Sequence, residues 1–378
     1  MFTAELKSIV EAEARATGFA ACGVAPVPED EQEYFAEWVA AGRAGEMEYL
    51  KRADEQGRLL RSSLRVALPW ARSVIVCAWN YNANTPISID PAPPDTGWIA
   101  RYAQSGDAAG APADYHNVML GKLRRIEAVL RKNGTGEFES RCYVDTGPVV
   151  ERVFAQYAGI GWTGKNTCIL NEKLGSWLFL GVIVTSLGPA PEMPLTIAAD
   201  RCGSCTRCID ACPTNALVAP RQMDASLCIA YLTIEKKGSI AEELRGPMGR
   251  QVFGCDICQD VCPWNSKNTK APIQTSPEMQ PREQLINPSL TWLAELDSAG
   301  FKRLFKGSPV ERTKLKGLRR NVAIAMGNTE DAQFLPRLQE WSGADDLVLR
   351  DTAQWAMEKI GPNNGRGRSA SMKMPSQP

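Results

Sequence analysis

Apolar residues recur at helical spacing in three segments of the first half of the chain, residues 4–17, 31–41 and 115–132, which predicts amphipathic helices. Continuous apolar runs at residues 73–79, 138–144 and 177–185 are short and rich in β-branched residues, which predicts strands. Helices alternating with strands indicate an α/β domain over residues 1–195. Two polar stretches interrupt it: residues 82–96 predict a long surface loop, and residues 104–113 predict a flexible insertion.

The second half of the chain changes character twice. A Pro-rich linker at 188–194 leads into a cysteine-rich segment, residues 196–270, and a Pro- and Gln-rich connector follows at 270–288. Helical spacing then returns at residues 318–328, where a glycine is expected to end the helix, and at 332–340 and 347–360. Helix pairs of this kind resemble HEAT-type repeats, so residues 271–360 predict a helical domain. Residues 361–378 lack periodicity and are expected to be disordered.

Composition narrows the class of protein. A chain of 378 residues is long enough for two or three domains. Lys and Arg balance Asp and Glu at 43 each, so any affinity for nucleic acid must come from a local basic patch. The N-terminus lacks the apolar core of a secretion signal, and no apolar run approaches the length that spans a bilayer. We therefore expect a protein of the reducing cytoplasm with no membrane partner.

Seven of the 12 cysteines form two runs, and an eighth, Cys228, lies between the runs. The first is C-x2-C-x2-C-x3-C-P at residues 202–213. The second, C-x2-C-x3-C-P at residues 255–263, lacks its leading cysteine, which Cys228 can replace. This is the thiolate spacing of ferredoxins with two [4Fe–4S] clusters, in which the fourth cysteine of each run binds the other cluster. A pair of zinc sites or a set of disulfides is the alternative.

The predicted ligands of one cluster are Cys202, Cys205, Cys208 and Cys262. Those of the other cluster are Cys212, Cys228, Cys255 and Cys258. The remaining cysteines are expected to be small buried apolar residues: Cys22, Cys77, Cys142 and Cys168.

Gly, Asp, Lys and aromatic residues are concentrated in three further stretches, residues 101–116, 144–149 and 159–167. Asp145 follows a predicted strand and precedes a helix expected to open at Pro148, so it is either a buried catalytic acid or a cap of that helix. His116, the only histidine, is either a capping or surface residue or part of the same site. The third stretch offers amides and Lys165 to an anionic or polar ligand, or is a plain connection.

Together these segments resemble one family. RYA…DYH, VDTGPV, GWTGKN, CGSCTRCIDACPTNAL, SLCIAYLTIE and GCDICQDVCPWN occur in the order seen in epoxyqueuosine reductases, over about residues 1–360. The resemblance implies a nitroreductase-like cobalamin domain, similar to that of corrinoid-dependent reductive dehalogenases. It also implies a small α+β ferredoxin-like domain with two [4Fe–4S] clusters and a C-terminal HEAT-like domain. The implied reaction is the last step of queuosine synthesis, reduction of the epoxide of epoxyqueuosine to an alkene at the wobble position of tRNA.

By this resemblance, Asp145 is the proton donor. The family motifs around corrinoid and substrate contain Arg101, Tyr102, His116, Lys165, Asn166 and Thr167. A low-potential donor would reduce the clusters, and the clusters would pass electrons to cobalamin. The Co(I) state of cobalamin is a strong nucleophile of a kind that side chains cannot supply. Proton donation by Asp145 requires burial that raises its pKa. Because the chain has no D-x-H-x-x-G motif, we expect the cobalt of the bound corrinoid to lack a protein histidine ligand. The resemblance also implies a monomer.

A basic stretch at residues 301–321 is the predicted contact with tRNA phosphates, although a solvated helix face is the alternative. Its single acid is Glu311. Its bases are Lys302, Arg303, Lys306, Arg312, Lys314, Lys316, Arg319 and Arg320. Two other functions compete with the tRNA enzyme. A reductive dehalogenase usually carries an export signal, and a non-catalytic ferredoxin module on a helical scaffold leaves residues 1–195 without a role.

Overall fold

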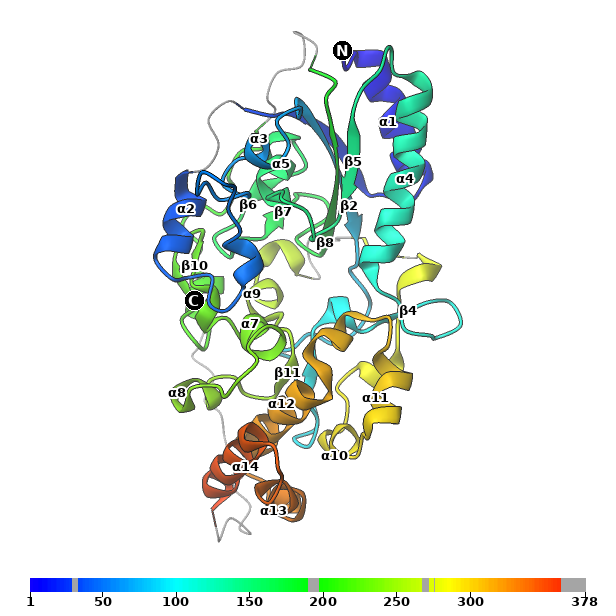
Figure 1. Cartoon of the computed structure of the whole chain (residues 1–378). Coiled ribbons are helices and arrows are strands. Elements are labelled where there is room, and N and C mark those ends of the chain that lie inside the picture. The colour runs from blue at the N-terminus through cyan, green and yellow to red at the C-terminus, as the bar shows by residue number, and fades with distance from the viewer. Residues whose placement is uncertain (29–32, 190–196, 267–271, 275, 362–378) are drawn as a thin grey trace.

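The computed structural model describes residues 1–28, 33–189, 197–266, 272–274 and 276–361 (Figure 1). Three sequence predictions fall partly outside these residues: the start of the helix at 31–41, most of the linker at 188–194, and the tail from residue 361. The first residues of the connector at 270–288 also lie outside them. Within the described part of the chain, no helix is long and apolar enough to cross a membrane.

A four-stranded antiparallel sheet forms the upper half of the molecule in Figure 1. Its order is β1 (Ala21–Pro26), β2 (Ser73–Asn80), β8 (Leu178–Thr185) and β5 (Ser140–Tyr143). The apolar runs predicted at 73–79, 138–144 and 177–185 are therefore strands. β1 was not predicted, because its sequence ACGVAP is short, carries a Gly and a Pro, and has no clear alternation.

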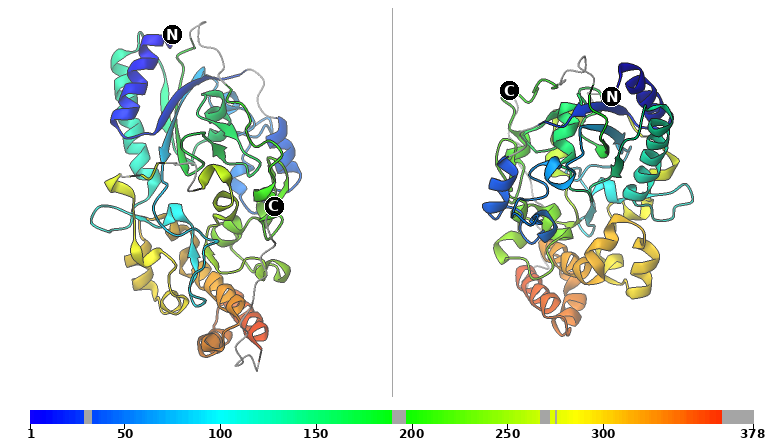
Figure 2. Two further views of the ribbon diagram at one scale, coloured as in Figure 1. Left: turned by 180° about the vertical axis from the view of Figure 1, so that it is seen from behind. Right: turned by 45° about the horizontal axis from the view of Figure 1, so that its top comes forward.

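Helices cover both faces of this sheet (Figures 1 and 2). On one face lie α1 (Ala4–Ala16) and α4 (Tyr115–Asn133), close to the predicted bounds, and their apolar side chains form one core with the sheet. On the other face α3 (Leu64–Ala67) and α5 (Glu151–Tyr157) form a second core. Burial on both sides explains why every residue of β2 is buried. The result is a mixed α/β architecture in three layers.

The segment predicted as a flexible insertion, residues 104–113, is only partly so. Gln104 is buried, its side chain donates to Ile99 O at 2.8 Å, and β4 (Ser105–Gly106) pairs with β12 (Gln280–Pro281). Only the turn around Gly110 is exposed. Polar composition suggested mobility here, but the distant connector supplies a pairing partner that composition cannot reveal.

The cysteine-rich segment is built from short elements. α6 (Arg207–Asp210) packs against α9 (Ile257–Asp260), and α7 (Ile229–Ile234) follows Cys228. β11 (Gln251–Phe253) pairs in parallel with β3 (Trp98–Ile99) of the first segment. The other short elements are α2 (Glu33–Ala40), β6 (Trp162–Thr163), β7 (Ile169–Leu170), α8 (Glu242–Arg245), β9 (Leu217–Ala219) and β10 (Gln222–Met223).

The C-terminal part consists of helices, as the apolar spacing predicted. They are α10 (Leu290–Ala294), α11 (Ser298–Phe305), α12 (Lys314–Thr329), α13 (Leu335–Ser342) and α14 (Leu347–Ile360). Their core also takes in Ile99 and Ala103 from the first segment.

α12 does not end at Gly327, as was predicted, but continues to Thr329 and is followed by Glu330 in a left-handed conformation. A Cβ on Gly327 would lie only 2.9 Å from Ala356. The glycine therefore permits close approach of α14 and does not terminate the helix.

Candidate functional site

Asp145 lies in a tight turn after β5. Its backbone has φ 58°, a left-handed conformation that costs a non-glycine residue free energy, and Thr146 N donates to Val144 O at 2.6 Å across the turn. Arg61 Nη2 donates to the Asp145 carbonyl at 3.2 Å. α5 begins only at Glu151 and not at Pro148, so the predicted helix start was wrong. The capping position is Val150, five residues after Asp145, which removes the capping alternative.

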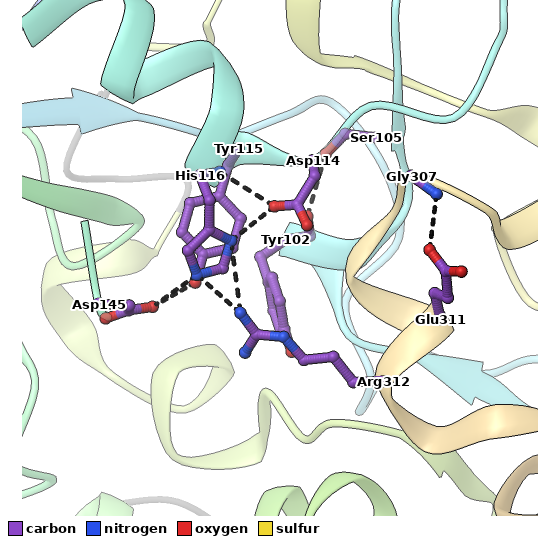
Figure 3. Close-up of polar contacts among 9 residues, drawn as sticks. All are labelled: Tyr102, Ser105, Asp114, Tyr115, His116, Asp145, Gly307, Glu311 and Arg312. Carbon is purple, nitrogen blue, oxygen red and sulfur yellow. Dashed lines mark hydrogen bonds and ion pairs between the residues drawn. The ribbon is translucent and has the colours of Figure 1, made fainter. Parts of the chain in front are cut away.

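The first turn of α4 delivers the partners of Asp145. Asp114 caps this helix, and its side chain accepts a hydrogen bond from His116 N at 3.0 Å. Tyr115 and His116 are therefore the first two residues of the helix. The Tyr115 ring stacks on Phe179 with centroids 4.0 Å apart. Its hydroxyl donates a hydrogen bond to Asp145 Oδ2. Figure 3 shows Tyr115, His116 and Asp145 pointing toward one another.

His116 is surrounded by charged groups. Its Nδ1 lies 2.6 Å from Asp114 Oδ1, and its Nε2 lies 3.6 Å from Asp145 Oδ2. Arg312, from the 3-10 helix η8 (Pro309–Thr313) of the C-terminal part, places Nη2 2.8 Å from the same Nε2 (Figure 3). The only histidine of the chain therefore belongs to the same site as Asp145, and segments around residues 115, 145 and 312 meet there.

The charge state of Asp145 differs from the expected one. Desolvation by the surrounding protein raises its pKa, but hydrogen bonds with His116 and Tyr115 outweigh this effect and lower the pKa to about 2. The raised pKa that proton donation by Asp145 would require is therefore not found, because the sequence could not show these two donors. Asp145 is a carboxylate at neutral pH in this arrangement, and the neighbouring protons lie on Tyr115 and on the His116 ring.

Asp145 faces a cavity of about 760 Å3, which explains why its side chain is 56% exposed. Four arginines line the cavity: Arg52, Arg61, Arg141 and Arg312. Only two acids, Asp145 and Glu235, line it as well, so the walls carry net positive charge. Such a cavity suits a ligand with phosphate or other anionic groups.

The structure divides the residues predicted around the cofactor into two groups. Tyr102 lies beside the Asp145 site, with its ring 6.0 Å from that of Tyr115, so the segment 104–113 does not separate the two motifs. Arg101 is buried elsewhere. It donates to Ala83 O and Thr85 O, and its guanidinium lies 4.8 Å from the Trp177 ring, so it fixes the loop at 82–96.

Lys165, Asn166 and Thr167 lie where the α/β layer meets the cysteine-rich segment. Lys165 Nζ donates to Gly203 O at 2.7 Å, and Asn166 Nδ2 donates to Cys258 O at 3.3 Å. Thr167 accepts from Arg152 at 3.2 Å. None of the three lines the Asp145 cavity. Their contacts hold the GWTGKNT stretch against the cysteines, while a contact with a corrinoid stays a prediction.

None of the 12 cysteines forms a disulfide, so the disulfide alternative is wrong. Electrostatic interactions link several of the predicted ligands, and Cys168 interacts with members of both predicted groups, so the assignment of ligands to two clusters stays a prediction. Burial raises the pKa of Cys262, and the thiols of Cys202 and Cys208 add to that effect. Burial likewise raises the pKa of Cys255, to which Cys228 and Cys212 contribute. Among the residues described, no three His, Cys, Asp or Glu side chains converge closely enough to hold a single metal ion.

Comparison with known proteins decides the family. The model for the 4Fe-4S double cluster binding domain matches residues 201–265, and the model described as epoxyqueuosine reductase QueG, DUF1730, matches residues 61–146. The epoxyqueuosine reductase of Xanthomonas campestris is 35% identical over 92% of this chain and 94% of its own. This chain belongs to the epoxyqueuosine reductase family.

Solved structures of epoxyqueuosine reductases agree. One, crystallised with an epoxyqueuosine-modified tRNA stem loop, has a TM-score of 0.78 and 30% identity over 94% of this chain and 90% of that one. The Bacillus subtilis epoxyqueuosine reductase, described with a catalytic aspartate loop swung out of its active site, has a TM-score of 0.77 and 30% identity. It covers 94% of this chain and 91% of that one.

In this member of the epoxyqueuosine reductase family, the basic stretch is not a single face. Arg320 is 1% exposed, and its guanidinium donates to the carbonyls of Leu232, Lys236 and Gly238 at 2.7–2.8 Å. The prediction that Arg320 contacts phosphate was therefore wrong. Arg319 is half-buried and donates to Leu296 O at 3.0 Å. The exposed bases are Lys302, Arg303, Lys306, Arg312, Lys314 and Lys316.

Three residues of the site were missed from the sequence. Tyr115 was noted only as a neighbour of His116, although a tyrosine beside a histidine at a helix start was a usable signal. Cys168, expected to be a plain apolar residue, forms a hydrogen bond with Cys258 that raises the pKa of Cys258. Glu151 is buried beside the Asp145 turn. Burial and the Asp145 charge raise its pKa to about 7.

Proposed function

We propose that this chain reduces the epoxide of epoxyqueuosine in tRNA to the alkene of queuosine, the last step of queuosine biosynthesis. A corrinoid would bind in the basic cavity, and two [4Fe–4S] clusters would supply electrons. The observation that carries the proposal is the position of Asp145, hydrogen-bonded to Tyr115 and open to a cavity lined by four arginines. The relative crystallised with an epoxyqueuosine-modified tRNA stem loop supports the substrate.

The cluster ligands and the cavity are connected by one short helix. Cys228 precedes α7, and Glu235, which directly follows this helix, lines the cavity. At 1.5 Å per helical residue, the backbone between them spans roughly 10 Å. A cluster held by Cys212, Cys228, Cys255 and Cys258 would thus lie near the corrinoid. Cys202, Cys205, Cys208 and Cys262 would hold the other cluster.

The residues fit a corrinoid in charge and position. The arginine-lined walls suit its anionic nucleotide tail and the phosphates of RNA. A bound corrinoid supplies a low-potential two-electron nucleophile, which no side chain of the chain can provide. The chain's own residues hold the substrate, exclude water and deliver protons.

Asp145 would carry the proton to the oxygen that leaves the epoxide. Because its pKa is low, it does not store that proton itself. The His116 ring lies 3.6 Å from Asp145 Oδ2 and can replace the proton that Asp145 hands on, whereas Tyr115, whose pKa is raised by burial, keeps its proton and orients the carboxylate through its hydrogen bond. The group therefore acts as a short relay that begins inside the protein and ends at the cavity.

The exposed bases on α11, η8 and α12 would contact tRNA phosphates outside the cavity. We further interpret the sheet with its helices as a nitroreductase-like domain, and α12–α14 as HEAT-like helices. We also propose that the protein is a cytoplasmic monomer and that a low-potential donor reduces its clusters. The dehalogenase and ferredoxin alternatives are disfavoured, since similarity to epoxyqueuosine reductases covers 92% of the chain, helical part included.

The direct test is turnover. Reduced, cluster- and cobalamin-loaded protein is incubated anaerobically with tRNA that contains epoxyqueuosine, and the nucleosides are then analysed by mass spectrometry. Formation of queuosine supports the proposal. Unchanged epoxyqueuosine with fully loaded protein would reject it.

A further inference from the structure

Arg312 joins the C-terminal part of the chain to the proton relay. The backbone beneath it is fixed, because Val310 and Thr313 are buried and Thr313 Oγ1 donates to Thr233 O at 3.0 Å. The Arg312 side chain, in contrast, is exposed and lines the cavity. The adjacent acid, Glu311, accepts from Gly307 N at 2.9 Å and turns away from it (Figure 3). Within the part of the chain that the structure describes, no carboxylate forms an ion pair with Arg312.

The short contact between Arg312 and His116 fixes the state of the ring. A guanidinium has only N–H donors, so Nη2 at 2.8 Å from Nε2 requires a free lone pair on that nitrogen. The ring proton then lies on Nδ1, which donates to Asp114 Oδ1 at 2.6 Å. In this neutral tautomer, His116 presents no N–H to Asp145, so the hydrogen bond through which His116 lowers the pKa of Asp145 belongs to the protonated ring.

The charges around His116 oppose this neutral state. Two carboxylates, Asp114 and Asp145, favour a charged ring, Arg312 disfavours it, and the rings of Tyr102 and Tyr115 pack nearby without charge. Burial lowers the pKa of His116, but hydrogen bonds with the two carboxylates raise it by more. Arg312 is thus a neighbouring cation that disfavours protonation of a ring that the two carboxylates otherwise dispose to accept a proton.

We infer that Arg312 is a positioning residue that holds His116 in its neutral tautomer until a phosphate of the RNA substrate binds the guanidinium. Once Arg312 is drawn away, Nε2 takes up a proton from water and donates it toward Asp145 Oδ2, 3.6 Å away. The His116–Asp145 pair then holds the proton that the reaction consumes. Docking of RNA is thereby coupled to loading of the relay. This inference rests on the proposed function for its ligand.

An RNA phosphate is the ligand that the surroundings of Arg312 favour. A guanidinium can donate two parallel hydrogen bonds to two oxygens of one phosphate. Arg52, Arg61 and Arg141 line the same cavity as Arg312. On the outer side, the exposed Lys314 follows Arg312 along the chain toward α12. A phosphate group approaching the cavity meets Arg312, which forms no ion pair with a carboxylate within the described residues, although the charges of Asp114 and Asp145 lie close enough to attract it.

The chain's single histidine makes this inference measurable without turnover. In full-length, cluster-loaded protein labelled at histidine, one imidazole gives the only titrating ring signals in NMR. Arg312→Ala should move the midpoint of the His116 titration to higher pH, and Arg312→Lys should restore much of the wild-type value because it keeps the charge. The control is Arg337→Ala, an arginine of α13 paired with Glu340 at 2.7 Å, which should leave the midpoint unchanged. An unchanged midpoint in Arg312→Ala would overturn the inference.

A second arm tests the ligand with an unmodified anticodon stem-loop RNA. In the wild type, saturating RNA should raise the His116 midpoint toward that of Arg312→Ala, and in Arg312→Ala it should cause no comparable rise. A rise of equal size in both proteins would assign the effect to the RNA charge alone, and no rise in the wild type would remove phosphate as the ligand. Either result contradicts the inference while leaving the proposed reaction, which is tested by turnover, untouched.

Discussion

The hydroxyl of Tyr115 donates a hydrogen bond to Asp145 Oδ2, joining the first turn of α4 to the turn that follows β5. The Tyr115 ring is held by Phe179, which lies parallel to it at 4.0 Å. The left-handed backbone of Asp145 keeps the carboxylate facing this hydroxyl. A rigid donor and a strained acceptor are therefore fixed together at the cavity wall, which is the arrangement expected of a proton relay and not of a helix cap.

Removal of this hydrogen bond should slow turnover. Asp145→Asn should cut the single-turnover rate by roughly 10²–10⁴-fold, the range for loss of a general acid. Tyr115→Phe keeps the stack on Phe179 but loses a hydrogen bond to a charged group, about 1.5–3 kcal/mol, so a fall of roughly 10–100-fold is expected. Because Tyr115 acts through the Asp145 carboxylate, adding Tyr115→Phe to the Asp145→Asn variant should slow turnover little further.

Iron content and bound cobalamin serve as controls in these variants and should stay at wild-type levels. Multiplied losses in the double variant would mean that Tyr115 acts independently of Asp145. A near-normal rate in Asp145→Asn would remove Asp145 from the chemistry.

Glu151 should make stability depend on pH. Its pKa rises from an ordinary value of 4.5 to about 7 on folding, chiefly through burial, so between these pH values the folded state holds a proton that the unfolded chain has released. Stability therefore falls as pH rises through this window. Glu151→Gln cannot ionise, and it should be more stable than the wild type above pH 7, by up to about 3 kcal/mol.

Denaturant unfolding of the loaded protein at pH 5 and pH 8 measures this difference. The gain should be present at pH 8 and largely absent at pH 5. The same gain at both pH values would show that the variant repacks the site and that Glu151 does not titrate there.

The exposed bases and Arg320 should behave differently. Replacing Lys302, Lys306 and Lys314 with Ala should weaken tRNA binding and reduce the slope of log K against log salt by about 1 per lost phosphate contact. Arg320→Ala should instead lower the free energy of unfolding by roughly 2–4 kcal/mol, because three backbone carbonyls lose their donor. Its folded fraction should bind tRNA with the wild-type salt slope. An unchanged slope in the triple variant would place tRNA elsewhere.

Cys228 should be required for one cluster. Reconstituted wild type is expected to contain about eight iron atoms, four in each cubane, and Cys228→Ala about four. Cys142→Ala is the matched control, since Cys142 lies beside Glu127, away from the two thiol groups. Full iron content in Cys228→Ala would show that another residue completes the second cysteine run.

The sequence predicted most of the secondary structure, because long helices and buried strands carry strong periodic patterns. α4 and α14 lie within one residue of their expected ends. β1 was missed, because a six-residue strand with Gly23 and Pro26 has little pattern of its own and forms only by pairing with β2. The ordered part of residues 104–113 was missed for the same reason, since its partner is β12.

The site was predictable where chemistry shows in residue type and spacing, as for the cysteine runs and Asp145. It was not predictable where function depends on long-range contacts. Arg312 and Arg320 stand eight residues apart in one basic stretch, yet one reaches His116 and the other is buried against carbonyls of α7 and of the segment that follows α7. The low pKa of Asp145 has the same origin, since its donors come from a helix 30 residues earlier.

The central claim is tested most directly by single turnover of epoxyqueuosine-containing tRNA. Wild-type protein, loaded with clusters and cobalamin and reduced anaerobically, should convert the nucleoside to queuosine, as read by mass spectrometry. Protein without cobalamin should give no product, and Asp145→Asn should give product at least roughly 10²-fold more slowly. Persistence of epoxyqueuosine with the fully loaded wild type, or equal conversion without cobalamin, would contradict the account.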